Sequence, residues 1–328
     1  MPLRQRSRRF GGTVILCTLL LRLHMLGAGQ WLLTQLAQPN IAALLTYIET
    51  GRIVRFSASS EDPPAHEAES AAPWILPKDL PVFGPQDAAA AKLYYVCSLR
   101  PDLEALMEQP LRWDLTGEKP TVLILHSHAT ECYTRTTEEY TETSAYRTLD
   151  ERYNMLSIGD RVAQVLLSQG IGVIQDRSLH DHPNYNTAYG NSRSSAESYL
   201  AQYPSIRLVL DLHRDASDGE NQLRTAAPIN GASCAQLMLV MGTNAGGLRH
   251  EGWEDNLSLA LKLQTQLERQ APGITRPISL RSQRFNQDLS PGALLVEVGA
   301  AGDTHGEALR AAEQLAQAIA ALAEGTGG

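Results

Sequence analysis

From residue 121 onward, short hydrophobic runs alternate along the chain with stretches of helical period. Runs rich in Val, Leu and Ile predict buried strands at 121–125, 171–174, 206–212, 236–241 and 293–298. Apolar residues that recur every three or four positions predict helices at 154–169, 255–268 and 307–322, and a capping signature predicts a further helix beginning at Ser192. Strands that alternate with helices predict an α/β fold, with a mainly parallel sheet and helices on both of its faces.

The first 40 residues have a different pattern, in which a basic segment precedes an apolar one. Four arginines lie within residues 2–9, and an apolar run that Arg22 interrupts extends from Gly11 to Leu36. This order predicts an export signal. We favour an uncleaved membrane anchor, and the alternative is a signal peptide cleaved near residues 27–29. Because the arginines precede the span, the rest of the chain is expected outside the cytoplasm.

Between these two parts, residues 41–118 are expected to form a linker and a lead-in region. Residues 41–53 suit a short amphipathic helix, whereas residues 57–90 are rich in Ala, Ser, Glu, Asp and Pro and lack the apolar content that offsets chain entropy. Residues 88–108 are compatible with a helix or with a strand followed by a helix. We therefore divide the chain into a basic tail with its anchor (1–40), a linker and lead-in region (41–118) and a globular domain (119–328).

Charge, cysteines and motifs exclude several classes of protein. The formal net charge of −8 argues against phosphate binding as the main activity, so no nucleic-acid partner is expected. The four cysteines are scattered and form no CxxC pair, which argues against a disulfide framework and a zinc knuckle. The chain also lacks the motifs of serine hydrolases and of nucleotide-binding loops.

Polar side chains lie at the ends of three predicted strands, where the active sites of such sheets are found. His128 follows the first strand, while His213 and Glu297 come at the ends of two later ones. Glu131 is three residues after His128, so both side chains can reach one cation if the backbone turns there. A catalytic zinc site needs three His, Asp or Glu ligands and a carboxylate that accepts a proton from water. We therefore predict that His128, Glu131 and His213 bind Zn²⁺ and that Glu297 is the general base.

Four neighbouring residues have more than one interpretation. Strand alternation is expected to place His126 on the same face as His128, where it would support a ligand or face the substrate. Arg214 would orient a ligand, grip a substrate carboxylate or form a salt-bridged turn. Asn286 is either a substrate-contacting amide or a turn former. Cys132, beside Glu131, is either a small packed residue or a thiol that binds the metal or is oxidised.

Five sequence blocks carry a resemblance to a known family, in the order LILHSHATECY, YNTAYGNSR, LVLDLHRDA, INGASCAQLMLVMGTN and RFNQDLSPGALLVEVGA. Together they resemble the stage II sporulation protein P family of endospore-forming bacteria. The resemblance places the family's histidines on His128 and His213 and its glutamates on Glu131 and Glu297. Cys132 stands where the family usually has serine. Related amidases take their glutamate ligand from farther along the chain, so another carboxylate is the alternative to Glu131.

The resemblance also implies a function. It implies a zinc amidase-like or carboxypeptidase-like fold and makes the domain at 119–328 the catalytic one. The activity would be that of a membrane-anchored N-acetylmuramoyl-L-alanine amidase that also cleaves peptide cross-links in peptidoglycan. It would act in septal wall thinning and forespore engulfment, in the intermembrane space of the sporulation septum, together with stage II sporulation proteins D and M.

Two other functions stay open at this point. One is a zinc carboxypeptidase that trims wall peptides, in which Arg214, Arg281 or Arg284 would bind a terminal carboxylate. The other is a non-catalytic wall-binding or assembly protein, which would be expected to lack a ligand or the base.

Overall fold

The computed structural model describes residues 83–111, 113–115, 119–135, 139, 142–144, 146–217 and 222–324. The predicted anchor, the predicted helix at 41–53 and most of the predicted linker lie outside these residues. In the part of the chain so described, no helix is both long and apolar enough to cross a membrane.

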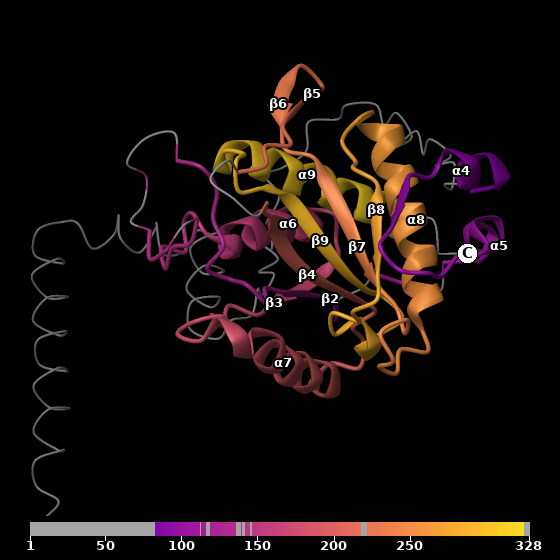
Figure 1. The fold of residues 1–328 in the computed structure, drawn as a ribbon, viewed down its shortest axis with the longest axis horizontal. Helices are drawn as coiled ribbons and strands as arrows, with labels where there is room; N and C mark the ends of the chain where they lie inside the picture. Colours follow the sequence, from indigo (N-terminus) through magenta and orange to yellow (C-terminus); the bar gives the residue numbers. More distant parts are fainter. Residues whose placement is uncertain are drawn as a thin grey trace, which may run out of the picture. The chain divides into compact units, whose positions relative to one another are not determined.

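A seven-stranded sheet forms the centre of the described structure (Figure 1). Its strands lie in the order β1 (Leu93–Tyr95), β8 (Ile278–Arg281), β7 (Leu237–Gly242), β9 (Ala293–Ala300), β4 (Leu208–Asp215), β2 (Pro120–Leu125) and β3 (Gly172–Gln175). Neighbouring strands pair in parallel except β7 and β9, which are antiparallel. The sheet is therefore mixed: two parallel blocks, β1–β8–β7 and β9–β4–β2–β3, run in opposite directions.

All the strands predicted from residue 121 onward are present, and their ends differ from the prediction by at most three residues. The prediction missed β8, because this strand is short and two of its four residues, Ser279 and Arg281, are polar. It also missed a separate hairpin of β5 (Ala227–Ile229) and β6 (Ala232–Cys234), which projects beyond the sheet in Figure 1. Asn230 and Gly231 form its turn with positive φ angles of 49° and 80°.

The long helices of the described residues are α6 (Met155–Ser168), α7 (Ala188–Gln202), α8 (Trp253–Gln270) and α9 (His305–Glu324). The Asn154 side chain caps α6 by accepting a hydrogen bond of 3.0 Å from the amide of Leu156. Helix α7 begins four residues earlier than the predicted start at Ser192, directly after the 3-10 turn η1 (Tyr185–Thr187). Residues 185–191 are mostly Tyr, Asn, Thr and Gly, so no apolar period indicates the start of this helix.

The side chains of β2 alternate between two faces of the sheet, and helices cover both of them. Leu123 and Leu125 pack in one cluster with Ala196 of α7. His126, the next residue, points to the opposite face, where its ring lies against Gly159 of α6. Arg161 of α6 pairs with Glu313 of α9 at 2.9 Å, which ties these two helices into one layer. Figure 1 shows α7 on one side of the sheet and α6 with α9 on the other, so the prediction of helices on both faces is confirmed.

The lead-in region contributes to the sheet rather than preceding it. Helix α4 (Pro85–Ala90), strand β1 and helix α5 (Leu103–Glu108) occupy this stretch. Asp87 of α4 pairs with Arg269 of α8 at 2.8 Å, and β1 extends the sheet by pairing with β8. The prediction of an unstructured linker up to residue 90 is therefore wrong for residues 85–90. The sheet therefore begins before residue 119, the predicted start of the globular domain.

Candidate metal centre

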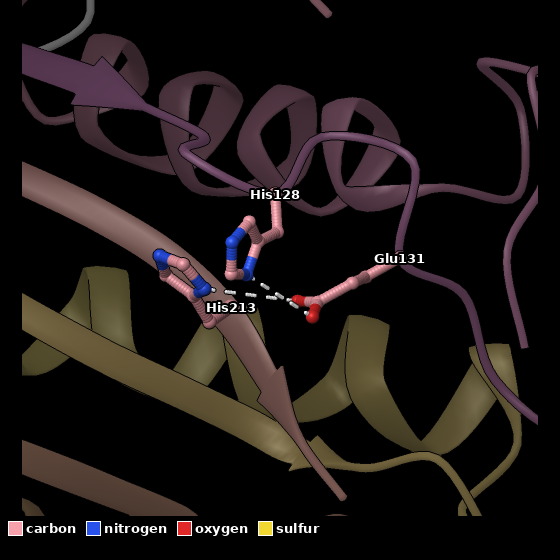
Figure 2. Close-up of side chains that lie close together, drawn as sticks. All are labelled: His128, Glu131 and His213. Atoms are coloured by element: carbon pink, nitrogen blue, oxygen red, sulfur yellow. Dashed lines mark ion pairs between the residues drawn. The ribbon is translucent and has the colours of Figure 1, made fainter. Parts of the chain in front are cut away.

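Three side chains converge on the face of the sheet that α7 covers: His128, Glu131 and His213 (Figure 2). One potential ligand atom of each lies within 4.8 Å of those of the other two. Nδ1 of His128 is 3.5 Å from Oε1 of Glu131, and Nδ1 of His213 is 3.7 Å from Oε2. These separations are close to the roughly 3.4 Å expected between two ligands of a tetrahedral zinc ion. The structure thus brings the three predicted ligands together, and their spacing and chemistry fit a metal ion.

Backbone geometry explains why two of these side chains meet. The chain turns after β2, and the amide of Glu131 donates a hydrogen bond of 3.1 Å to the carbonyl of His128. This turn brings residues three apart to the same side, as the spacing predicted. His213 comes from β4, where alternation places it on the same face as Asp211.

Asp211 fixes the orientation of the His213 ring. Its Oδ1 lies 3.0 Å from Nε2 of His213, and its carboxylate also accepts hydrogen bonds from the amide and hydroxyl of Ser127 at 2.8 and 2.6 Å. Burial alone would lower the pKa of His213, but the neighbouring Asp211 outweighs it and raises this pKa to about 10. A carboxylate behind a metal-binding imidazole is a common device for setting its tautomer and basicity.

Arg214 contacts the carboxylate of Glu131 through both its side chain and its backbone amide. Its side chain is buried and donates to the carbonyls of Cys132 and Tyr146 at 3.1 and 2.9 Å, and its backbone amide lies 3.3 Å from Oε2 of Glu131. Burial by itself would raise the pKa of Glu131, but Arg214 and the two histidines outweigh this and hold the pKa below its usual value. Of the three interpretations of Arg214, orientation of a ligand is the one this placement favours.

Glu297 lies on β9 directly beside His213, as the pairing of the two strands shows. Its Oε2 atom is buried and has no hydrogen-bond partner among the described residues. Burial raises the pKa of Glu297 to about 8, against the opposing effect of His213. A carboxyl group that titrates near neutrality can both accept and return a proton.

The strands continue past these two residues, so the predicted position at the strand ends is wrong. β4 runs on to Asp215 and β9 to Ala300. The register shifts by one residue just beyond the His213–Glu297 pair, and Gly299 adopts a φ of +74° in β9. A Cβ atom at residue 299 would lie 2.7 Å from Cβ of Ala235, so glycine is required for both reasons. The candidate site therefore sits on the face of the sheet, within the strands.

Three other residues singled out by the sequence lie elsewhere. His126 is on the opposite face, where its Nε2 is 3.1 Å from Nε2 of Gln175 and burial lowers its pKa to about 4. The expected common face with His128 is wrong because the chain turns between them. Asn286 donates to the carbonyl of Tyr189 at 2.9 Å and so ties the β8–β9 loop to α7. Cys132 is buried and does not belong to the metal cluster.

Two tyrosines beside the cluster were not predicted from the sequence. The Tyr185 ring stacks on His128 with a centroid distance of 4.5 Å, and the Tyr189 ring lies 5.5 Å from the same imidazole. They are four residues apart at the entry to α7, so the pair YNTAY was the available signal. Tyr185 is half exposed, so its ring lies at the edge of the site that faces solvent.

Comparisons with known proteins agree with the sequence blocks. The family model described as stage II sporulation protein P matches residues 59–320. A curated relative, stage II sporulation protein P of Bacillus subtilis (strain 168), is 29% identical over 218 residues, which is 63% of this chain and 52% of the relative. The chain thus spans about half the length of that relative.

Among solved structures, the chain is similar to two N-acetylmuramoyl-L-alanine amidases. That of Clostridium difficile 630 is 14% identical, with 64% of this chain and 95% of the amidase covered and a TM-score of 0.37. The apo form of Ami1 from Mycobacterium abscessus is 16% identical, with 62% of this chain and 96% of Ami1 covered and a TM-score of 0.37.

Proposed function

The chain belongs to the stage II sporulation protein P family, and we propose that it hydrolyses amide bonds of peptidoglycan with a zinc ion held by His128, Glu131 and His213. The observation that carries this proposal is the convergence of these three side chains beside the buried carboxyl group of Glu297. Two imidazoles and a carboxylate are a donor set that catalytic zinc sites use.

Each residue of the site would have its own part in the hydrolysis. The zinc ion would act as a Lewis acid toward the scissile carbonyl and the attacking water. Glu297 accepts a proton from that water as its oxygen bonds to the carbonyl carbon. When the carbon–nitrogen bond breaks, Glu297 returns the proton to the leaving nitrogen. Asp211 and Arg214 hold His213 and Glu131 in place throughout.

The carboxypeptidase alternative is less well supported, because it needs an arginine that is open to a terminal carboxylate. Arg214 is engaged with Glu131 and two backbone carbonyls. Arg281 donates to Ser279 at 3.0 Å, and Arg284 pairs with Asp288 at 3.1 Å. Each candidate arginine thus already has a partner within the protein.

The cellular setting is part of the same proposal. The family and the basic-then-apolar N-terminal pattern support an anchored protein whose catalytic domain faces the intermembrane space of the sporulation septum. There it would thin the septal wall during engulfment, cleave cross-links as well as stem-peptide amides, and act with stage II sporulation proteins D and M.

The test combines metal content with product identity for the full chain. We expect about one zinc ion per molecule and the release of free stem peptides from purified sacculi. His213→Ala should lose the zinc, whereas Glu297→Gln should keep it and lose activity by about 100- to 10,000-fold. Release of terminal amino acids alone would favour the carboxypeptidase. Activity without bound metal, or binding to sacculi without any cleavage, would contradict the proposal.

A further inference from the structure

Resting on the proposed metal centre, we infer that Arg147 is the positioning residue that holds two of the metal ligands, Glu131 and His128, in register. No sequence pattern predicts this role, because Arg147 lies in none of the predicted strands or helices. Its guanidinium group reaches both ligands, one directly and the other through an aromatic ring.

The direct contact is with Glu131. One guanidinium nitrogen of Arg147 lies 3.4 Å from Oε1 of Glu131, and the other donates to Oδ2 of Asp181 at 2.7 Å and to Oγ1 of Thr130 at 3.2 Å. The fork of the arginine thus joins a metal ligand to a second carboxylate. A lysine has one nitrogen and cannot make these contacts at the same time.

The backbone around Arg147 fixes where the fork can reach. Residues 146–148 pair with residues 130–132, through an antiparallel bridge between Arg147 and Glu131. The amide of Cys132 donates to the carbonyl of Tyr146 at 3.0 Å, and the amide of Thr148 donates to the carbonyl of Thr130 at 2.8 Å. Arg147 is therefore held opposite the ligand it contacts.

The indirect contact is with His128. The guanidinium carbon of Arg147 lies 4.7 Å from the centre of the Tyr185 ring, and the same ring stacks on the imidazole of His128. A cation near an aromatic face is attracted to it, so Arg147 restrains Tyr185 and Tyr185 restrains His128. This chain of contacts links the β2 turn to the start of α7.

Asp181 offsets the positive charge that Arg147 places beside the proposed metal ion. Its side chain is fully buried and also accepts a hydrogen bond of 2.6 Å from the hydroxyl of Thr130. Glu131 has two arginines beside it, Arg147 and Arg214, whose charges would repel a metal ion. Asp181 balances the charge of Arg147, so the arginine can orient Glu131 while the net charge around the ligand stays low.

The experiment measures the zinc affinity of the full chain by competition with a chromogenic chelator. Arg147→Gln should weaken zinc binding by about 10- to 100-fold, the range typical of groups that orient metal ligands. Arg147→Lys keeps the charge without the fork and should recover only part of the affinity. Arg152→Gln is the matched control, because Arg152 forms an exposed pair with Asp150, 77% exposed on the arginine side chain, and should leave the affinity unchanged.

A double variant separates positioning from folding. Arg147→Gln alone leaves the buried Asp181 unpaired and can destabilise the fold, so Arg147→Gln/Asp181→Asn removes both charges. We expect the double variant to regain the metal-free thermal stability of the wild type but to keep the weakened zinc affinity. Wild-type affinity in either variant would overturn the inference while leaving the metal centre intact. A wild-type chain that binds no zinc would overturn the metal centre itself and the inference with it.

Discussion

The carboxylate of Asp211 lies 3.0 Å from Nε2 of His213 and leaves Nδ1 of that ring facing Glu131. An asparagine at 211 could not provide the negative charge that favours a proton on Nε2, so Nδ1 would be a poorer metal ligand. We expect Asp211→Asn to weaken zinc affinity by about 10- to 100-fold. Asp215→Asn, on the same strand but paired with Arg276, is the control. Equal zinc affinity in the two variants would contradict this role for Asp211.

Tyr185 should contribute to the site through its ring rather than its hydroxyl. The ring stacks on His128 at 4.5 Å. Tyr185→Phe keeps this contact, and its zinc affinity should equal that of the wild type. Tyr185→Ala removes it and should weaken zinc binding several-fold, in line with a stacking energy of about 1 kcal/mol. Chelator competition measures both variants, and an equal loss in Tyr185→Phe and Tyr185→Ala would show that the hydroxyl matters instead.

Gly159 of α6 packs tightly against the side chains of Gln175 and His126. A Cβ atom there would lie 2.5 Å from Nε2 of Gln175 and 2.6 Å from Nε2 of His126. Gly159→Ala should therefore lower the free energy of unfolding by about 1–3 kcal/mol. Gly190→Ala, within α7, meets open space and should raise it by up to about 1 kcal/mol through helix propensity. Chemical denaturation gives both values, and equal effects would contradict the packing argument.

Lys262 of α8 is a buried cation whose contribution to stability depends on pH. Its ammonium group donates to the carbonyl of Leu106 and the hydroxyl of Ser258, both at 2.8 Å, and burial lowers its pKa from 10.5 to about 8. The unfolded chain therefore binds this proton more tightly than the folded one. The destabilisation is complete below pH 8 and disappears as the pH rises to 10.5.

Replacing this lysine should reveal the penalty. At pH 7, Lys262→Met should raise the free energy of unfolding by roughly 1–2 kcal/mol, after allowing for the lost hydrogen bonds. The gain should shrink between pH 8 and 10.5, the interval between the folded and unfolded pKa values. Denaturant titrations at several pH values measure it, with the half-exposed Lys92→Met as the control. A gain that is constant with pH would contradict the buried-charge explanation.

Much of the fold could be predicted because its strands and helices have clear periods. Most of β2 and the first residues of β4 (208–210) and β9 (293–296) are continuous apolar runs, as expected for strands with both faces covered. The direction of β7 could not be predicted, because an apolar run reads the same in either direction. β1 and β8 are too short to show a period, and their pairing depends on residues far apart in the sequence.

The clustering of His128, Glu131 and His213 could also be predicted, because each lies on a strand or in a turn next to one. Arg147 could not, because its role depends on contacts with Glu131 and Asp181 that join segments 16 and 34 residues away. His126 shows the limit of extrapolating strand alternation. Its period ends where β2 ends, so the turn before His128 separates the two histidines.

The side-by-side pairing of His213 and Glu297 makes the candidate site more sensitive to the length of its strands than to the length of its loops. Each strand residue advances by about 3.3 Å and reverses the face on which the side chain lies. A one-residue insertion before either position would turn His213 or Glu297 away from α7. The one-residue register shift between β4 and β9 lies beyond this pair, next to Gly299. Insertions and deletions in relatives should therefore collect in the connecting loops and spare the first six residues of β4 and the first five of β9.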